Sequence, residues 1–218
     1  MESPIGRQFG GARRRLVEEL RVKGISDLAV LKAFENTPRH LFVPTGVAHR
    51  AYEDTPLPIG SGQTISQPMV HAYYLQLIKF TGNEKVLEIG TGSGFETVLL
   101  AHLAAQVFSV ERIAPLLENA RAAIAAAGVS NVSLLLGDGT HGWKAHAPYD
   151  VILVGAASPD VPAPLLEQLA DGGRMLIPVG TREEQKLIQV TRVGDAFEKA
   201  ELGPMRFVPL LGEHGWTS

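Results

Sequence analysis

Between Glu84 and Ile177 short apolar runs alternate with amphipathic stretches, and this alternation restricts the fold more than any other feature. Short apolar runs are typical of buried strands, and the longer stretches between them have apolar residues at helical spacing. The predicted strands cover 86–89, 107–110, 132–136, 151–154 and 175–177, and the predicted helices cover 96–104, 114–127 and 165–169. Strands that alternate with helices form a doubly wound, mostly parallel sheet of the α/β class.

The residues before this pattern predict three helices and one long loop. Apolar residues recur at helical spacing in a run that ends at Gly24, and Asp27 is a suitable N-cap for a second helix. A third helix is predicted over residues 69–79. Residues 44–63 are rich in proline and glycine and predict an irregular loop. Ordered loops of this length usually serve a site.

The residues after the pattern predict strands without helices between them. The runs 186–193 and 206–211 favour an antiparallel pair at one edge of the sheet. We therefore expect two parts that form one compact unit. Residues 1–80 are a helical cap with a substrate loop, and residues 81–218 are the α/β domain.

Composition excludes several classes of protein. The charge is near balance, with 23 Asp and Glu against 20 Lys and Arg, which argues against a dedicated nucleic-acid binder. There are no cysteines, no histidine pair with metal-ligand spacing, and no apolar run long enough to span a membrane. Residues 1–10 lack the apolar core of a signal peptide. We expect a cytoplasmic monomer that binds no metal, no nucleic acid and no membrane.

The strongest motif is the glycine loop at residues 87–94, Leu-Glu-Ile-Gly-Thr-Gly-Ser-Gly. Dinucleotide-binding proteins use G-x-G-x-x-G, which sets a pyrophosphate on a helix N-terminus. Here the spacing is G-x-G-x-G, residue 95 is Phe, and Glu88 precedes the first glycine. A carboxylate at that place would repel a pyrophosphate and favour a cationic amino acid. The loop therefore points to S-adenosylmethionine.

Two further acids follow the next two predicted strands. Glu111 ends its strand about 20 residues past the glycine loop, where an acid can accept both ribose hydroxyls. Asp138 lies between Gly137 and Gly139, where it suits recognition of the adenine amine. Taken singly, Glu111 also fits a solvated surface acid and Asp138 a turn residue. Together with the glycine loop they form a specific constellation.

These motifs make the sequence resemble the protein-L-isoaspartate O-methyltransferase family. The resemblance covers most of the chain, from Val17 to Leu211. The segment Thr64–Pro68, Thr-Ile-Ser-Gln-Pro, is the most diagnostic, because general methyltransferases share the glycine loop but not this segment. The other matching segments are 38–44, 51–60, 62–68, 88–94, 109–112, 137–139, 142–143, 172–174, 177–180 and 206–210.

The resemblance implies methyl transfer from S-adenosylmethionine to the free α-carboxylate of an isoaspartyl residue in a damaged protein. The resulting ester collapses to a succinimide, which starts repair. A carboxylate is ionised at neutral pH and needs no general base. The enzyme must therefore mainly orient the reactants and exclude water.

The resemblance and the motifs together give the expected site. The cofactor residues are Gln63, Thr64, Ile65, Ser66, His71, Glu88, Gly90, Thr91, Gly92, Glu111, Arg112, Asp138 and Gly139. The expected contacts to the isoaspartyl peptide are Ile59, Arg206, Phe207 and Val208. The loop at 51–62 and a strand at 206–209 would form the peptide groove, and an extended peptide can pair with such a strand.

Ser66 matches the family's active-site serine, and we expect its hydroxyl to orient the substrate carboxylate. No G-x-S-x-G elbow surrounds it, which argues against a hydrolase nucleophile. The alternative is that Ser66 caps the helix beginning near Pro68. His71 matches a family position near the cofactor, and the alternative is a packing or surface histidine.

Three other functions stay open. They are a methyltransferase acting on a small molecule, a nicotinamide dehydrogenase, and a module that binds S-adenosylmethionine without catalysis. The sequence also departs from the family's usual pattern. Phe95-Glu96 stands where bacterial members often have Tyr-Gln, Lys144 stands where proline is common, and Leu211 stands where some relatives have a threonine near the cofactor.

Overall fold

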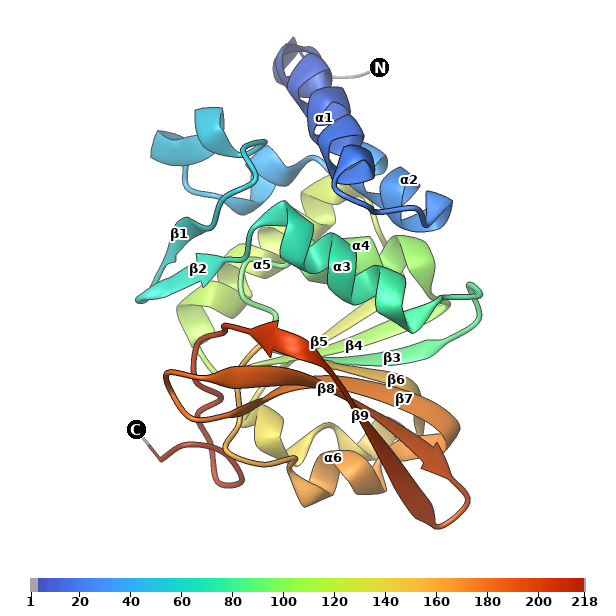
Figure 1. Ribbon diagram of the computed structural model, residues 1–218. Helices are drawn as coiled ribbons and strands as arrows, with labels where there is room; N and C mark the ends of the chain where they lie inside the picture. The colour runs from blue at the N-terminus through green and yellow to red at the C-terminus, as the bar shows by residue number, and fades with distance from the viewer. Residues whose placement is uncertain (1–3, 218) are drawn as a thin grey trace.

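The structure is a computed structural model that describes residues 4–217, and these residues include a seven-stranded sheet ordered β5-β4-β3-β6-β7-β8-β9 (Figure 1). The first five strands in this order are parallel, and β8 and β9 are antiparallel to their neighbours. The strands are β3 (Lys85–Ile89), β4 (Gln106–Glu111), β5 (Val132–Leu136), β6 (Tyr149–Val154), β7 (Leu169–Gly180), β8 (Gln185–Val193) and β9 (Ala196–Met205). The predicted α/β class with antiparallel edge strands is confirmed.

The order of the strands places a crevice at the centre of the sheet. From β3 the chain adds β4 and β5 on one side, then crosses back so that β6 pairs with β3 on the other side. In open parallel sheets ligands bind outside the carboxyl ends of the strands at such a switch point. The ends of β3, β4 and β6 are therefore the place to look for a site.

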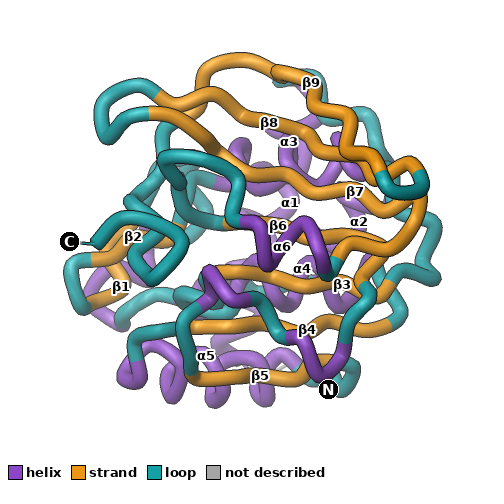
Figure 2. Tube along the Cα trace, turned by 90° about the horizontal axis from the view of Figure 1, so that it is seen from below, coloured by secondary structure: helices purple, strands orange, loops and turns teal. Residues whose placement is uncertain are grey.

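Helices cover both faces of the sheet. One face carries α3 (Pro68–Ile78), α4 (Phe95–Leu103) and α5 (Ala114–Ala127), with α1 (Pro4–Val22) and α2 (Leu28–Asn36) stacked outside them (Figure 1). The other face carries α6 (Ala163–Glu167), seen nearest the viewer in Figure 2. One buried apolar cluster joins residues of α1–α3 to residues of the sheet, so the cap shares a core with the α/β part. No helix among residues 4–217 is long and apolar enough to cross a bilayer.

The two predicted helix signals near the N-terminus are confirmed. After α1, Gly24 adopts a positive φ of 103°, and the Ile25 N–H bonds back to the Leu20 carbonyl. The Asp27 carboxylate accepts hydrogen bonds from the N–H groups of Ala29 and Val30 at the start of α2.

The stretch 44–63 is more regular than predicted. It contains the 3₁₀ helix η2 (Thr45–Arg50) and the strand β1 (Leu57–Gly60), which pairs with β2 (Gln63–Ile65). Another 3₁₀ helix, η1 (Arg39–Phe42), precedes it. Ser61 and its flanking glycines have positive φ, so the glycines that predict an irregular loop instead build a tight hairpin turn.

The prediction for the C-terminal edge is wrong in its second strand. The partner of β8 is β9 at residues 196–205, reached through the two-residue turn Gly194-Asp195, while 206–211 is irregular apart from isolated bridges. β9 is exposed and rich in charge, so it lacks the apolar run of a buried strand. In 206–211, Phe207 and Leu210 pack against the apolar clusters, whereas Val208 is exposed.

Candidate active site

A pocket lies at the carboxyl ends of β3, β4 and β6. We call the lining residues at and just after these strand ends the floor of the pocket. They are Ile89–Ser93, Val110–Ile113 and Gly155–Ala156. Its hairpin wall is formed by Ile59 and Gln63–Ser66, and its C-terminal wall by Phe207–Leu211. The remaining lining residues are His71, Glu96, Leu116 and Gly139.

The glycine loop lies in the floor and is shaped by close contacts. Gly92 has a φ of 53°, and a Cβ there would lie 3.6 Å from Ile59 Cδ1 of the hairpin wall. Gly94 has a φ of 85°, and a Cβ there would lie 3.0 Å from Ile124 of α5. The two glycines therefore allow the loop to turn tightly, and they let Ile59 and Ile124 approach its backbone.

Glu111 connects the end of β4 to the glycine loop. One carboxylate oxygen accepts the Gly92 N–H at 2.8 Å, and the other accepts the Ile113 N–H at 2.9 Å. Each carboxylate oxygen can accept a second hydrogen bond. The carboxylate is thus held in the floor with acceptor capacity left for two hydroxyls, which fits the predicted ribose contact.

Glu88 lies beneath the floor and is not a lining residue. One oxygen accepts hydrogen bonds from the hydroxyls of Thr97 and Ser109, and the Ser109 hydroxyl also contacts that of Thr91 at 2.6 Å. Its other oxygen is buried without a hydrogen-bond partner in the described chain. Burial, reinforced by the charge of nearby Glu96, raises the pKa of the Glu88 carboxyl well above its usual value, which favours its neutral, protonated form.

Ser66 lines the pocket just before α3 and is held through its backbone. The buried Arg39 donates from Nη2 to the Ser66 carbonyl at 3.0 Å and stacks over the Phe95 ring at 4.8 Å. Burial lowers the pKa of the Arg39 guanidinium to about 9. The N-cap of α3 is Gln67, and the Met69 N–H bonds to Asp54 Oδ1 at 2.8 Å. The alternative role of Ser66 as the cap of this helix is therefore wrong.

His71 and Glu96 face each other at the side of the pocket. His71 Nδ1 lies 3.5 Å from Glu96 Oε2, and both residues line the cavity. Within the described residues, His71 Nε2 and Glu96 Oε1 are buried without hydrogen-bond partners. Both residues line the same cavity, so a polar ligand bound there would supply partners for these two atoms. Sequence reasoning did not select Glu96, although its departure from the usual glutamine drew attention to it.

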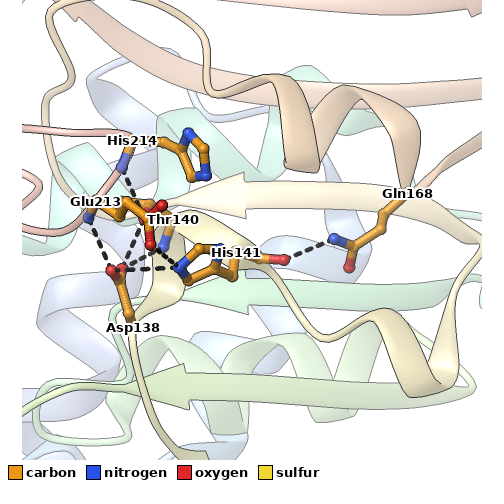
Figure 3. A network of polar contacts seen from close by, with 6 residues as sticks. All are labelled: Asp138, Thr140, His141, Gln168, Glu213 and His214. Carbon is orange, nitrogen blue, oxygen red and sulfur yellow. Dashed lines mark hydrogen bonds and ion pairs between the residues drawn. The ribbon is translucent and has the colours of Figure 1, made fainter.

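Asp138 is not a lining residue of the pocket, and Figure 3 shows its carboxylate among the contacts with Thr140, His141 and Glu213. Its carboxylate accepts the Thr140 N–H at 2.9 Å, the Thr140 hydroxyl at 2.7 Å and the Glu213 N–H at 2.8 Å. Burial alone would raise the pKa of this carboxyl, but these hydrogen bonds bring it below its usual value. Gly139 does line the pocket. In this structure Asp138 therefore fixes a loop beside the pocket instead of lining it.

The residues expected to contact the substrate also divide into some that line the pocket and one that does not. Ile59, Phe207 and Val208 line the pocket, whereas Arg206 is exposed and does not. The C-terminal wall is held on one side, since the Ala157 N–H bonds to the Val208 carbonyl at 2.8 Å and the Leu210 N–H bonds to the Ala157 carbonyl at 2.7 Å. On its other edge the Phe207 N–H donates to Gln185 Oε1 at 2.7 Å and Pro209 has no N–H, so a peptide that pairs there meets only carbonyl acceptors.

Most expected residues meet in one pocket, and the pocket adds others. Gln63, Thr64, Ile65, Ser66, His71, Gly90, Thr91, Gly92, Glu111, Arg112 and Gly139 all line it, while Glu88 and Asp138 support it from outside. Ile89 and Ser93 belong to the predicted glycine loop, Pro209 belongs to the predicted groove segment 206–209, and Leu211 holds a position already noted near the cofactor. The lining residues that sequence reasoning missed are Glu96, Val110, Ile113, Leu116, Gly155, Ala156 and Leu210. Gly155 could have been found, because it directly follows a predicted central strand.

Comparison with known sequences gives a consistent result. Residues 12–215 match the family described as protein-L-isoaspartate(D-aspartate) O-methyltransferase (PCMT). A protein-L-isoaspartate O-methyltransferase of Dictyoglomus thermophilum is 53% identical over 209 residues, which cover 96% of this chain and 95% of the relative. One from Syntrophus aciditrophicus is 50% identical over 214 residues, covering 96% and 98%.

Solved structures agree with the sequences. A protein-L-isoaspartate O-methyltransferase superposes with a TM-score of 0.84 at 28% identity, covering 93% of this chain and 67% of that one. A PCMT from Plasmodium falciparum, solved in complex with S-adenosyl-L-homocysteine, superposes with a TM-score of 0.82 at 26% identity, covering 91% and 98%.

Proposed function

Because this chain belongs to the protein-L-isoaspartate(D-aspartate) O-methyltransferase family, we propose that the floor holds S-adenosyl-L-methionine and that the two walls hold the isoaspartyl peptide. The activity is S-adenosylmethionine-dependent methylation of the α-carboxylate of isoaspartyl residues, which starts repair through a succinimide. The observation that supports the placement is the convergence of the glycine loop, Glu111 and Ser66 on one pocket.

The residues present fit the cofactor. Glu111 offers two acceptors for the ribose, and the positive-φ Gly92 lets a ligand approach the backbone. The buried Glu96 Oε1, which has no partner among the described residues, is an acceptor suited to the α-ammonium of the methionine part. When bound, S-adenosylmethionine supplies an electrophilic methyl group on a sulfonium that leaves as a neutral thioether.

The protein's own part in catalysis is orientation. The substrate carboxylate is already ionised, so no base is needed. We assign Ser66 the role of donating its hydroxyl hydrogen bond to that carboxylate, which fixes one oxygen for in-line attack on the methyl carbon. Arg39 acts as a positioning residue, because it holds the Ser66 carbonyl from beneath. The hairpin and C-terminal walls exclude water from the reacting atoms.

Substrate contacts come from the walls. Ile59, Phe207 and Val208 supply apolar surface next to the floor, and Phe207 is supported by Tyr74 at a ring distance of 5.4 Å. Arg206 is exposed beside them and can meet acidic peptide groups from outside the pocket. That the enzyme works as a cytoplasmic monomer stays a prediction from the sequence.

The decisive experiment uses methyl-labelled S-adenosylmethionine and two peptides that differ only in an aspartyl or isoaspartyl linkage. We expect a base-labile labelled ester on the isoaspartyl peptide alone. Equal labelling of both peptides would contradict the proposed walls, because they would not distinguish the two linkages. Cofactor binding without transfer to either peptide would move the acceptor to a small molecule.

A further inference from the structure

A second cluster of metal-ligating side chains lies outside the pocket, between the 3₁₀ helix η3 (Gly139–His141) and the C-terminal segment (Figure 3). His141, Glu213 and His214 each offer one ligand atom, and these atoms lie within 4.8 Å of one another. His141 Nε2 is 3.1 Å from Glu213 Oε2, and the two imidazole rings stand 5.0 Å apart at 88°.

The backbone beneath these side chains is fixed by hydrogen bonds. Asp138 accepts the Glu213 N–H at 2.8 Å, and the Thr140 hydroxyl oxygen accepts the His214 N–H at 3.2 Å. Gln168 donates from Nε2 to the His141 carbonyl at 2.7 Å (Figure 3). A Cβ at Gly212 would collide with the Asp138 carboxylate, so the approach of the two segments depends on this glycine. The three side chains therefore extend from backbone positions that these hydrogen bonds hold in place.

The donor set selects a class of metal. Two imidazole nitrogens and one carboxylate suit zinc and its first-row neighbours, whereas magnesium and calcium prefer oxygen ligands alone. The Asp138 carboxylate, 3.8 Å from His141 Nε2, adds a further negative charge beside the cluster. We propose that His141, Glu213 and His214 form a divalent transition-metal site of the zinc type.

Occupation of this site would tether the C-terminal segment to the sheet. Leu210 and Leu211, just before the cluster, belong to the C-terminal wall, and Gly139, just before His141, also lines the pocket. A metal that bridges the two segments therefore holds one wall of the pocket in place. All three ligands are exposed, which leaves coordination positions open to water.

The sequence did not reveal this site because its ligands are not near each other along the chain. The expectation of no metal rested on the lack of local histidine pairs, but His141 and His214 are joined only by the fold. Such a site is found only when the two segments are placed in space.

The test is a zinc titration of the untagged full chain at pH 7.5, measured by competition with a chromophoric chelator. We expect one zinc ion per chain, and at least tenfold weaker binding in each of His141→Gln, Glu213→Gln and His214→Gln. The matched control is His49→Gln, which removes an exposed histidine of η2 outside the cluster and is expected to leave the affinity unchanged. Binding of S-adenosylhomocysteine by every variant checks that it is folded.

Two further readouts keep the proposal open to failure. Ligating histidines must lose their protons, so zinc binding is expected to fall away between pH 7.5 and pH 5.5. Zinc is also expected to slow amide hydrogen exchange at residues 210–216 in the wild-type chain and not in His214→Gln. Equal affinity in His49→Gln and His214→Gln, or the absence of a one-to-one complex, would overturn the site. Zinc binding that leaves amide hydrogen exchange at residues 210–216 unchanged would overturn the proposal that the metal tethers the C-terminal segment.

Discussion

At the floor of the pocket three strands, β3, β4 and β6, end side by side, whereas the walls are the β1–β2 hairpin and the irregular residues 207–211. The register of a parallel sheet fixes the floor, because each of these strands is hydrogen-bonded to its neighbours. The walls depend on turns, on Arg39 beneath Ser66, and on the bonds to Ala157.

This difference suggests a division of work. A floor built by the sheet suits a ligand that never changes, such as the cofactor. Walls built by loops suit an acceptor that varies in sequence. Substitutions in the floor should therefore change cofactor affinity, and substitutions in the walls should change turnover.

The largest effect is expected for Glu111→Ala in the floor. It removes two acceptors for ligand hydroxyls and releases Gly92 and Ile113 from the carboxylate. Hydrogen bonds to a charged group are worth about 1.5–3 kcal/mol each, so losing two should raise the dissociation constant for S-adenosylhomocysteine by at least about 100-fold. Calorimetry measures this, with Glu118→Ala on the exposed face of α5 as the control. An unchanged affinity would remove Glu111 from the ribose site.

The pH dependence of folding stability tests the protonation state of Glu88, which lies beneath the floor. The raised pKa of Glu88 keeps it protonated in the folded chain, while the unfolded chain loses that proton above pH 4.5. The folded state then binds more protons, so stability should fall as pH rises above 4.5, by up to about 1.4 kcal/mol per unit, until the folded group also ionises. Urea unfolding at several pH values should show a flatter profile in Glu88→Gln. Parallel profiles for the two proteins would contradict a neutral Glu88.

In the hairpin wall, Ser66→Ala should lower turnover about tenfold, since one hydrogen bond to a charged carboxylate is lost. Cofactor affinity should stay within about twofold, because the floor is untouched. Initial rates at saturating cofactor and parallel calorimetry measure both quantities. Ser130→Ala, at an exposed serine outside the pocket, is the matched control and should change neither quantity. An equal loss of turnover and affinity would reject the orienting role of Ser66.

The smallest effect is expected outside both regions. Asp27→Ala removes the cap of α2 and should lower the free energy of unfolding by about 1 kcal/mol, with kinetic constants unchanged. Asp27→Asn keeps an acceptor and should restore most of that stability. Urea unfolding and steady-state rates check both variants. A fall in turnover with Asp27→Ala would show that the N-terminus of α2 affects the walls of the pocket.

The same division explains what could be predicted from the sequence. The helix 114–127 and the strand 132–136 agree with the structure at both ends. Pro115 and Gly128 mark the two ends of the helix, and a short apolar run marks the strand. The glycine loop and Glu111 follow from the same regular pattern. The tail strand failed at 206–211, since this segment pairs only through isolated contacts with Ala157 and Trp216. Its apolar run combines Phe207 and Leu210, which pack against the core, with the exposed Val208.

Side-chain direction was the least predictable property. Asp138 has the right place in the chain, but its carboxylate caps η3 through Thr140, as the alternative of a turn residue predicts, and also accepts the distant Glu213 N–H. Glu88 was expected beside the ligand, yet the hydroxyls of Thr97 and Ser109 hold it under the floor. The contacts to Glu213 and Ser109 join segments far apart in the sequence, and no local pattern identifies them.

The charged edge strand β9 has a consequence for how copies of the chain meet. An open sheet edge is a template for pairing with a strand of another molecule. On β9, Glu198, Lys199 and Glu201 are exposed, and the register against β8 shifts near Gly203, which bends the strand. A neighbouring chain would have to bury these charges to extend the sheet. The charge and bend of this edge therefore disfavour edge-to-edge association between copies of the chain.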